Sequence, residues 1–266
     1  MGCTEIDLAY HGVRVVHDAA LRLAPGAVTA LVGPNGSGKS TLLRALARLH
    51  PVAHGEVLLA DDMPARTLSA KEFARRVTLL AQSRPTPSGV TVRDVVGYGR
   101  HPYRGRWRAA DPGGPAAIAH AMEVTGVVAM ADRPVDELSG GELQRVWLAT
   151  CLAQDTGVLL LDEPTTFLDL RYQVETLDLI RDLADDHDVA VGVVLHDLDQ
   201  AAAVADAVVL LDEGRVRAGG LARDVLTPEL LSEVYGIRID VSIDPATEQL
   251  TTHPIGRHSL RSRRSA

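Results

Sequence analysis

The sequence predicts an α/β fold with a mostly parallel sheet. Short, continuously apolar runs alternate with segments of helical periodicity along most of the 266 residues. Apolar runs without polar alternation are typical of strands covered on both faces, as in a parallel sheet. These predicted strands are 28–32, 77–81, 158–161, 189–195 and 207–211. A glycine-rich loop and an amphipathic helix follow the first of them.

The composition indicates a folded, acidic protein. Hydrophobic residues make up 46% and charged residues 23% of the chain, which excludes a disordered protein. The net charge of −8 argues against general nucleic-acid binding and leaves room only for a local basic patch. Neither a signal-peptide pattern nor an apolar stretch of about 18 residues occurs, so we expect a cytosolic chain that does not cross a membrane.

Two cysteines are too few for a disulfide framework. We expect Cys3 to be a stray thiol in a loose terminus and Cys151 to be a small core residue.

The helix after the glycine-rich loop is expected to continue until Pro51, because the residue before a proline leaves the helical region. Its apolar residues recur at helical spacing: Leu42, Ala45, Leu46 and Leu49. From about 85 to 154 a good strand run is absent, and helix starts occur at Thr91, near 111–115 and at Ser139. We therefore predict a helical subdomain inserted between two strands of the core.

Two further features complete the chain. The turn residues 212–214 predict a hairpin that leads into 215–217. The last ten residues hold four Arg and no acid, which predicts a mobile basic tail.

Residues 33–40 match the phosphate-binding pattern G-x-x-x-x-G-K-[ST]. Glycines let backbone N–H groups approach phosphates, and the N-terminus of the following helix adds a favourable dipole. We expect Lys39 to reach the β- and γ-phosphates and Ser40 to place its hydroxyl on Mg²⁺. The predicted phosphate-site residues are Gly33, Pro34, Asn35, Gly36, Ser37, Gly38, Lys39, Ser40 and Thr41. The pattern predicts a nucleotide-binding protein.

A second motif is the apolar strand 158–161, which ends in Asp162 and Glu163. We interpret it as a strand that runs beside the loop strand and delivers an acid to Mg²⁺. Asp162 is the candidate for that metal contact. Glu163, one residue further, could orient or deprotonate the attacking water.

A third motif is Leu-Ser-Gly-Gly-Glu at 138–142. Ser139 and Glu142 fit a capping box that opens a helix. The adjacent Gly140 and Gly141 leave backbone N–H groups open to an anion. Since the phosphate loop already supplies one anion site, a second half-site implies a head-to-tail pair of chains in which each completes the nucleotide site of the other.

With these motifs, the chain resembles the ATP-binding subunits of ABC transporters over residues 4–240. In that family 138–142 is the signature sequence, which usually ends in Gln where this chain has Glu142. The resemblance implies a P-loop NTPase core with an N-terminal antiparallel β portion and a helical subdomain at about 85–154. Residues 241–266 would form a C-terminal extension with the basic tail.

Four more site residues follow from this resemblance. It implies that Tyr10 stacks on adenine and that Gln82 senses Mg²⁺ and the γ-phosphate. It places Asp169 in a loop that crosses the dimer and His196 as the switch residue at the γ-phosphate. The implied cofactors are ATP and Mg²⁺. The implied metal set is Ser40, Gln82 and Asp162, and the implied catalytic set is Lys39, Glu163 and His196.

A finer resemblance, to ATPases that serve ferric-siderophore importers, lies in 99–103, 131–137, 152–156, 162–169 and 196–201. Asp199 stands where those ATPases typically have Asn. Haem and cobalamin importers share much of this sequence, so these cargoes stay open as alternatives.

Partners also follow from the resemblance. It implies a homodimer of ATPase subunits, peripheral on the cytoplasmic face of the membrane and bound to a transmembrane permease through the helical subdomain. An extracytoplasmic substrate-binding protein would act indirectly, and nucleic acid would not be a partner.

Other classes of protein explain fewer of these features. Ribosome-acting ABC ATPases fuse two cassettes in one chain, and chromosome-associated ones separate loop and signature by long coiled coils. Here the interval from Gln82 to Ser139 is short and lacks heptads. A soluble P-loop kinase would not explain the presence of the segment Ser139-Gly140-Gly141.

The segment 100–108 holds four Arg and two aromatic residues. It could bind single-stranded nucleic acid or be a solvated loop. We expect a third role for it, in which Tyr103 and Trp107 border the cleft that receives the permease.

Overall fold

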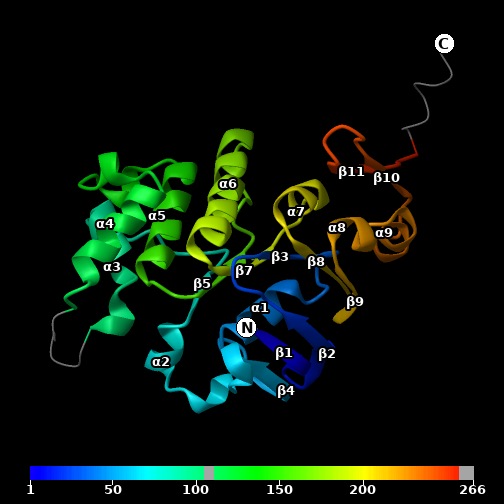
Figure 1. The fold of residues 1–266 in the computed structure, drawn as a ribbon, viewed down its shortest axis with the longest axis horizontal. Helices are drawn as coiled ribbons and strands as arrows, with labels where there is room; N and C mark the ends of the chain where they lie inside the picture. The colour runs from blue at the N-terminus through cyan, green and yellow to red at the C-terminus, as the bar shows by residue number, and fades with distance from the viewer. Residues whose placement is uncertain (105–110, 258–266) are drawn as a thin grey trace, which may run out of the picture.

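The computed structural model describes residues 1–104 and 111–257. A six-stranded sheet of order β5-β6-β7-β3-β8-β9 crosses the centre of the molecule (Figure 1). It is parallel except for the last strand, which runs antiparallel to its neighbour. Its strands are β3 (Val28–Val32), β5 (Val77–Leu80), β6 (Val158–Asp162), β7 (Ala190–Val194), β8 (Ala207–Asp212) and β9 (Arg215–Gly220). The apolar runs are therefore confirmed as strands of a mostly parallel sheet.

The prediction that the strand ending in Asp162 runs beside the strand before the phosphate loop was wrong. β7 lies between β6 and β3 and pairs with both, so β6 does not run beside the loop strand. The apolar runs are equivalent in pattern, and their order depends on how the connecting helices cross the sheet. Asp162 still comes near the phosphate loop because the carboxyl ends of parallel strands lie at one edge of the sheet.

A second, antiparallel sheet has the order β2-β1-β4, as the resemblance implies. Its strands are β1 (Gly2–Tyr10), β2 (Val13–Arg22) and β4 (Val52–Leu58). Helix α1 (Lys39–Leu46) lies between the two sheets, since Leu42 and Leu46 share one core with Ile6 and Leu8 of β1 and with Val194 of β7.

Cys3 is buried on β1 with 3% of its surface exposed, which contradicts the expected loose terminus. β1 pairs with β2 on one side and β4 on the other, so the N-terminus is held as a central strand. Cys151 is a buried residue of helix α5, as predicted.

Helix α1 ends at Leu46 and does not continue to Pro51. The backbone turns into the left-handed region at Arg48, with φ 58°, and Leu49 is 69% exposed. The guanidinium of Arg48 donates to the carbonyls of Ala65 and Leu68, each at 3.0 Å. This long-range contact accompanies a turn that the local sequence does not predict.

The segment 85–154 contains three α-helices and no β-strand where the structure describes it, as predicted. Its helices are α3 (Val92–Tyr98), α4 (Gly114–Val124) and α5 (Gly140–Ala153). Thr91 and Ser139 cap α3 and α5 with capping boxes. The three helices enclose a separate core that includes Val95, Met122 and Val146. Outside them, α2 (Ala70–Ala74) precedes β5, and short 3₁₀ turns occur at Ala60–Asp62, Ala65–Thr67, His101–Tyr103, Val128–Met130 and Val135–Glu137.

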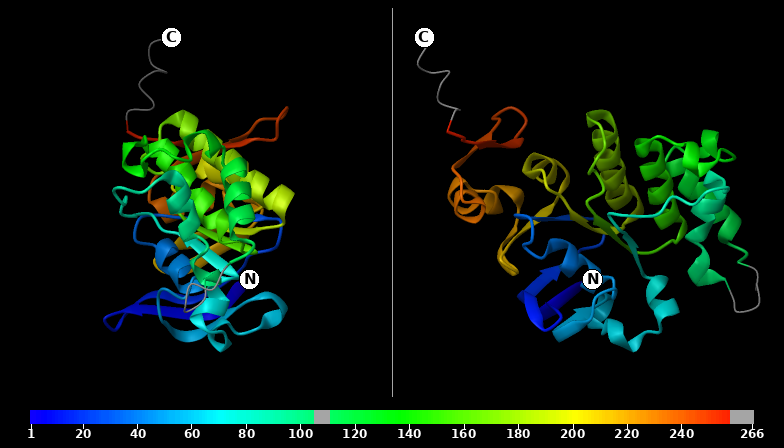
Figure 2. Two further views of the ribbon diagram at one scale, coloured as in Figure 1. Left: turned by 90° about the vertical axis from the view of Figure 1, so that its left-hand side faces the viewer. Right: turned by 180° about the vertical axis from the view of Figure 1, so that it is seen from behind.

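Helices α6 (Leu170–His187) and α7 (Leu198–Val204) pack against the central sheet in the main core. The chain continues through α8 (Ala222–Val225) and α9 (Pro228–Tyr235) into a hairpin of β10 (Ile239–Ile243) and β11 (Leu250–Pro254). Figure 2 shows this hairpin above the central sheet and the antiparallel sheet below it.

β10 spans the predicted boundary at residue 240, and its Ile239 and the Leu250 of β11 belong to the main core. The basic residues of 258–266 lie outside the described part of the chain. None of the described helices combines the length and the apolar character needed to cross a membrane.

Candidate nucleotide site

The phosphate loop connects the carboxyl end of β3 to α1. Lys39 is 5% exposed, and its Nζ donates to the carbonyls of Gly33 and Pro34, each at 2.8 Å. Burial lowers the pKa of the Lys39 ammonium, and the negative charges of Glu163 and Asp162 oppose that shift. Gly36 has φ 81°, and a Cβ there would meet nothing within 4 Å. The crest of the loop is therefore open to a phosphate group.

Asp162 ends β6 and is 1% exposed. Its Oδ2 accepts from Arg44 of α1 at 3.2 Å, whereas its Oδ1 is buried without a partner among the described residues. An unsatisfied buried acceptor costs free energy, so this oxygen is suited to receive a donor or a cation that arrives with the nucleotide. The sequence did not single out Arg44, because a charged residue on a helix looks the same whether it faces solvent or a carboxylate.

Glu163 lies at the centre of a polar cluster. Its Oε2 accepts from Gln82 Nε2 at 2.5 Å, and its Oε1 lies 2.6 Å from His196 Nε2. Thr166 Oγ1 also donates to Oε2, at 3.2 Å. Glu163 has φ 54°, a strained conformation for a residue with a side chain, which persists only where the surroundings hold it.

The structure therefore brings together Gln82, Glu163 and His196, three residues that the sequence placed near the γ-phosphate. They follow β5, β6 and β7, whose carboxyl ends meet at one edge. Sequence reasoning did not assign a role to Thr166, which lies within the motif at 162–169.

Tyr10 lies at the end of β1 and is 41% exposed. Its ring centroid is 4.4 Å from that of His50, with a tilt of 47°. In the described part of the chain its ring contact is with His50 and not with the phosphate loop, so the role at adenine stays a prediction.

The signature segment begins α5 with the predicted capping box. The Oε2 of Glu142 accepts from the backbone N of Ser139 at 2.9 Å, and the Ser139 hydroxyl accepts from Glu142 N at 3.4 Å. A Cβ at Gly140 would meet nothing within 4 Å, whereas one at Gly141 would lie 2.2 Å from the ring of Tyr172. Open space thus supports an anion-binding role for Gly140, and close packing on α6 explains Gly141.

Asp169 caps α6 by accepting from Tyr172 N at 3.0 Å. Helix α5 belongs to the helical subdomain, while α1 lies below the central sheet (Figure 1). Among the described residues, no hydrogen bond or ion pair joins the signature segment to the phosphate loop. The signature segment and the phosphate loop of one chain therefore lie in different parts of the fold.

The segment 100–108 is only partly described, because Trp107 and Arg108 lie within 105–110. Arg100 is 5% exposed and forms a bidentate ion pair with Asp111, at 2.8 and 3.1 Å. Its guanidinium also lies 3.7 Å from the ring centroid of Tyr103. Tyr103 OH donates to the carbonyl of Asp155 at 3.2 Å. Arg100 and Tyr103 thus have internal packing roles.

A phosphate loop and a cluster of polar groups at one edge of a parallel sheet define a P-loop ATPase. The sequence pattern of the family described as "ABC transporter" matches residues 16–166, more than half of the chain. The chain belongs to the ABC transporter family, as an ATP-hydrolysing subunit. The predicted family, fold and enzyme class are confirmed.

Comparison with known proteins places the chain among importer subunits. It is 41% identical over 256 residues to the ferric enterobactin transport ATP-binding protein FepC of Escherichia coli (strain K12), covering 95% of this chain and 93% of the relative. It is 46% identical over 236 residues to the hemin import ATP-binding protein HmuV of Rhodococcus jostii (strain RHA1), covering 89% and 80%. The solved inward-facing structure of a metal-chelate type ABC transporter has a TM-score of 0.83 at 25% identity, covering 96% of this chain and 97% of the other.

Proposed function

We propose that this chain energises the import of an iron chelate of the ferric-siderophore class. The hydrolytic part of the proposal is carried by the polar cluster around Glu163, which both Gln82 and His196 contact. The cargo is supported by the similarity to the ferric enterobactin subunit along almost the whole chain. Haem import is the second candidate, since the hemin import relative is 46% identical over a somewhat shorter match.

In this proposal the loop of 33–41 holds the phosphates of ATP through its backbone N–H groups, and Lys39 neutralises the β- and γ-phosphates. Glu163 accepts a proton from the attacking water, whose oxygen forms a bond to the γ-phosphorus as the bond to the β-phosphate oxygen breaks. Gln82 and His196 orient the carboxylate because each contacts a different one of its oxygens.

The residues present also fit a Mg²⁺ site. Asp162 offers a buried carboxylate oxygen without a partner in the described part of the chain, and oxygen ligands are what Mg²⁺ prefers. We place Ser40 and Gln82 beside Asp162 in this site. A bound Mg²⁺ would supply charge neutralisation on the phosphates.

The proposed active form is a head-to-tail homodimer, in which the signature segment of a second copy completes the nucleotide site. Beside Asp169, Phe167 is 97% exposed and Leu170 is 78% exposed. Exposed apolar residues next to a predicted dimer-crossing loop support a contact with the second copy. We further propose that Tyr10 stacks on adenine.

We place this dimer on the cytoplasmic face of the membrane, with the helical subdomain against the permease. The cassette would span residues 4–240, and an extracytoplasmic substrate-binding protein would deliver the cargo to the permease. The acidic net charge of −8 gives no support to a nucleic-acid partner.

The cargo is tested by deletion of the gene for this chain, followed by uptake of labelled ferric siderophores, haem and cobalamin. We expect loss of ferric-siderophore uptake, restored by the wild-type chain and not by Lys39→Ala. Loss of haem or cobalamin uptake alone would contradict the iron-chelate assignment.

The nucleotide site is tested by ATP binding and hydrolysis. Lys39→Ala should abolish tight MgATP binding or turnover, because it removes the loop cation that meets the phosphates. Lys71→Ala is the matched control, since Lys71 is the only other lysine and donates to the carbonyl of Arg104. Wild-type turnover in Lys39→Ala would reject the phosphate-loop assignment.

A further inference from the structure

Within the described part of the chain, Asp199 of α7 forms hydrogen bonds with the C-terminal hairpin. Asp199 Oδ1 accepts from the backbone N of Thr252 at 2.7 Å and from its Oγ1 at 2.8 Å. Thr252 lies in β11, which pairs antiparallel with β10 to form the hairpin. Hydrogen bonds to an ionised carboxylate are stronger than those between neutral groups, so this is a firm anchor.

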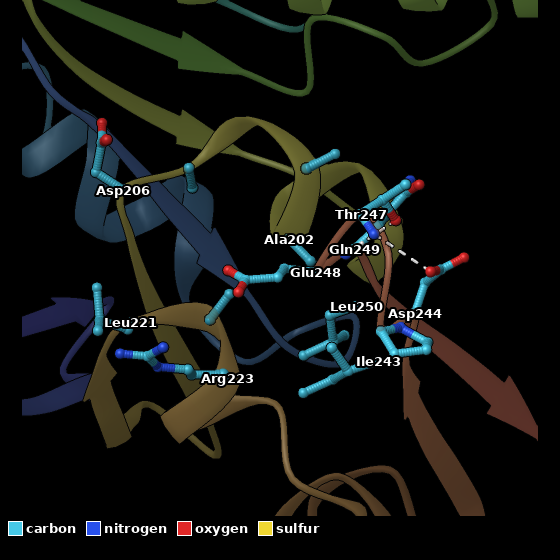
Figure 3. Close-up of a pocket in the computed structure, with 14 residues that line it drawn as sticks. Ala202, Asp206, Leu221, Arg223, Ile243, Asp244, Thr247, Glu248, Gln249 and Leu250 are labelled. Atoms are coloured by element: carbon cyan, nitrogen blue, oxygen red, sulfur yellow. Dashed lines mark hydrogen bonds between the residues drawn. The ribbon is translucent and has the colours of Figure 1, made fainter.

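The base of the hairpin is packed into the core, whereas its turn is separated from the nearby helices by a cavity. Ile239 and Leu250, at its base, are buried in the main core. Its turn stands over an open cavity of about 970 Å³, which α7 and α8 line from the other side (Figure 3). Because this hollow separates the turn from the two helices, Asp199 provides the polar link between the hairpin and α7.

The first turn of α7 also contacts the segment that follows Glu163. Asp197, directly after His196, caps the helix by accepting from Asp199 N at 2.9 Å and Gln200 N at 3.0 Å. Gln200 Oε1 accepts from the hydroxyl of Thr165 at 3.1 Å. Thr165 comes two residues after Glu163 in the sequence. The hairpin is thus anchored to the first turn of α7, which also contacts Thr165 in the segment after Glu163.

His196 lies in a short connection that is held at both ends. On one side, the backbone N of Leu195 donates to the carbonyl of Leu31 in the loop strand, at 3.2 Å. On the other side, Asp197 joins the connection to α7. A displacement of the first turn of α7 therefore changes the position of His196 relative to Glu163, which is 2.6 Å away.

We propose that the C-terminal hairpin is a positioning element of the ATPase site, with Asp199 as the positioning residue that acts through α7 on His196. This inference rests on the proposed function. It assigns a role in hydrolysis to the extension after residue 240 and to the Asp199–Thr252 contact.

The test compares steady-state ATP hydrolysis by the full-length purified chain and its variants. Asp199→Ala should lower kcat by about threefold to tenfold, the order expected for losing a charge-assisted hydrogen bond, with little change in KM for ATP. Asp199→Asn keeps an acceptor oxygen and should restore most of kcat. Thr252→Val keeps the backbone donor and should give a smaller loss than Asp199→Ala.

Ser242→Ala is the matched control. It removes the contacts of Ser242 Oγ with Thr251 Oγ1 at 2.8 Å and with His253 Nε2 at 3.1 Å, both within the hairpin, and leaves the contact with α7 in place. We expect its kcat to be that of the wild type. A loss as large as that of Asp199→Ala would mean that any loosening of the hairpin has the same effect, and would overturn the specific role of Asp199.

A double-mutant cycle with His196→Ala separates positioning from a general structural role. If Asp199 acts through His196, adding Asp199→Ala to His196→Ala should cause no further loss of kcat. Fully additive losses, or wild-type kcat in Asp199→Ala, would overturn the inference. Lys39→Ala tests the proposed ATP site independently, so its inactivity together with unchanged kcat in Asp199→Ala would reject only the role of the hairpin.

Discussion

At the scale of single residues, burial changes the chemistry of two thiols and one guanidinium. Burial raises the pKa of both Cys3 and Cys151 to about 11, so each thiol stays neutral and unreactive at neutral pH. Burial lowers the pKa of Arg84 to about 10, which leaves it charged. Its Nη2 donates to Gln144 Oε1 at 2.9 Å, and its guanidinium lies 5.4 Å from the ring centroid of Trp147. Arg84 is half-buried, and its Nη1 has no hydrogen-bond partner among the described residues.

The two thiols predict a loss of stability at alkaline pH. Between pH 9 and 11 the unfolded chain releases thiol protons that the folded chain keeps, so the free energy of unfolding falls as the pH rises. Each thiol should contribute a loss of about 1 kcal/mol at pH 10. Denaturant unfolding at pH 8 and pH 10 measures it.

The matched variant is Cys3→Ala with Cys151→Ala, which removes both thiols. Its stability should fall less between the two pH values than that of the wild type. Equal changes would show that the thiols ionise alike in the folded and unfolded chains.

At the scale of secondary structure, the junction of α5 and α6 connects the signature segment to the helix that Asp169 caps. The ring of Tyr172 fills the space where a Cβ of Gly141 would stand. Arg145 of α5 pairs with Glu175 of α6, and Arg171 pairs with the same carboxylate at 2.8 Å. An ion pair thus crosses the contact between the helical subdomain and the core.

This junction predicts different effects on stability for alanine substitutions at two neighbouring glycines. Gly141→Ala places a methyl group against Tyr172 and should lower the free energy of unfolding by about 1–3 kcal/mol, the usual cost of overpacking. Gly140→Ala has open space and should unfold like the wild type. Thermal unfolding of the monomer compares them.

Tyr172→Ala provides the control for this explanation. If the ring causes the clash, Gly141→Ala should cost less stability in the Tyr172→Ala background than in the wild type. An unchanged cost would place the origin of the effect elsewhere in α5.

At the scale of the whole molecule, the residues of the two proposed half-sites lie in different structural units. Gln82, Glu163 and His196 meet at the edge of the central sheet, and Gly140 lies at the start of α5 in the helical subdomain. Phe167, near Asp169, is exposed and would give the proposed dimer an apolar contact. A head-to-tail dimer would use all of these features.

Glu163→Gln should bind MgATP and hydrolyse it very slowly, because an amide cannot accept the proton of the attacking water. The trapped nucleotide should then hold two chains together. Light scattering with MgATP and with MgADP measures the mass, and Lys39→Ala combined with Glu163→Gln should stay monomeric. A monomer under every nucleotide condition would argue against the shared site.

The sequence by itself determined the parts that depend on neighbouring residues. The phosphate loop of 33–40, the acids after the apolar run at 158–161 and the capping box of Ser139 are contiguous patterns whose physics is local. The buried strands follow from the same kind of signal, since continuous apolar runs need cover on both faces.

Only the tertiary structure decided which distant residues meet. It placed β7 between β6 and β3, ended α1 at Leu46, and made the N-terminus a central strand. It also paired Arg44 with Asp162 and Asp199 with Thr252. Equivalent apolar runs can be ordered in several ways, and a polar side chain has the same local pattern whether it faces water or a distant partner. These choices therefore depend on long-range packing, which a single sequence does not display.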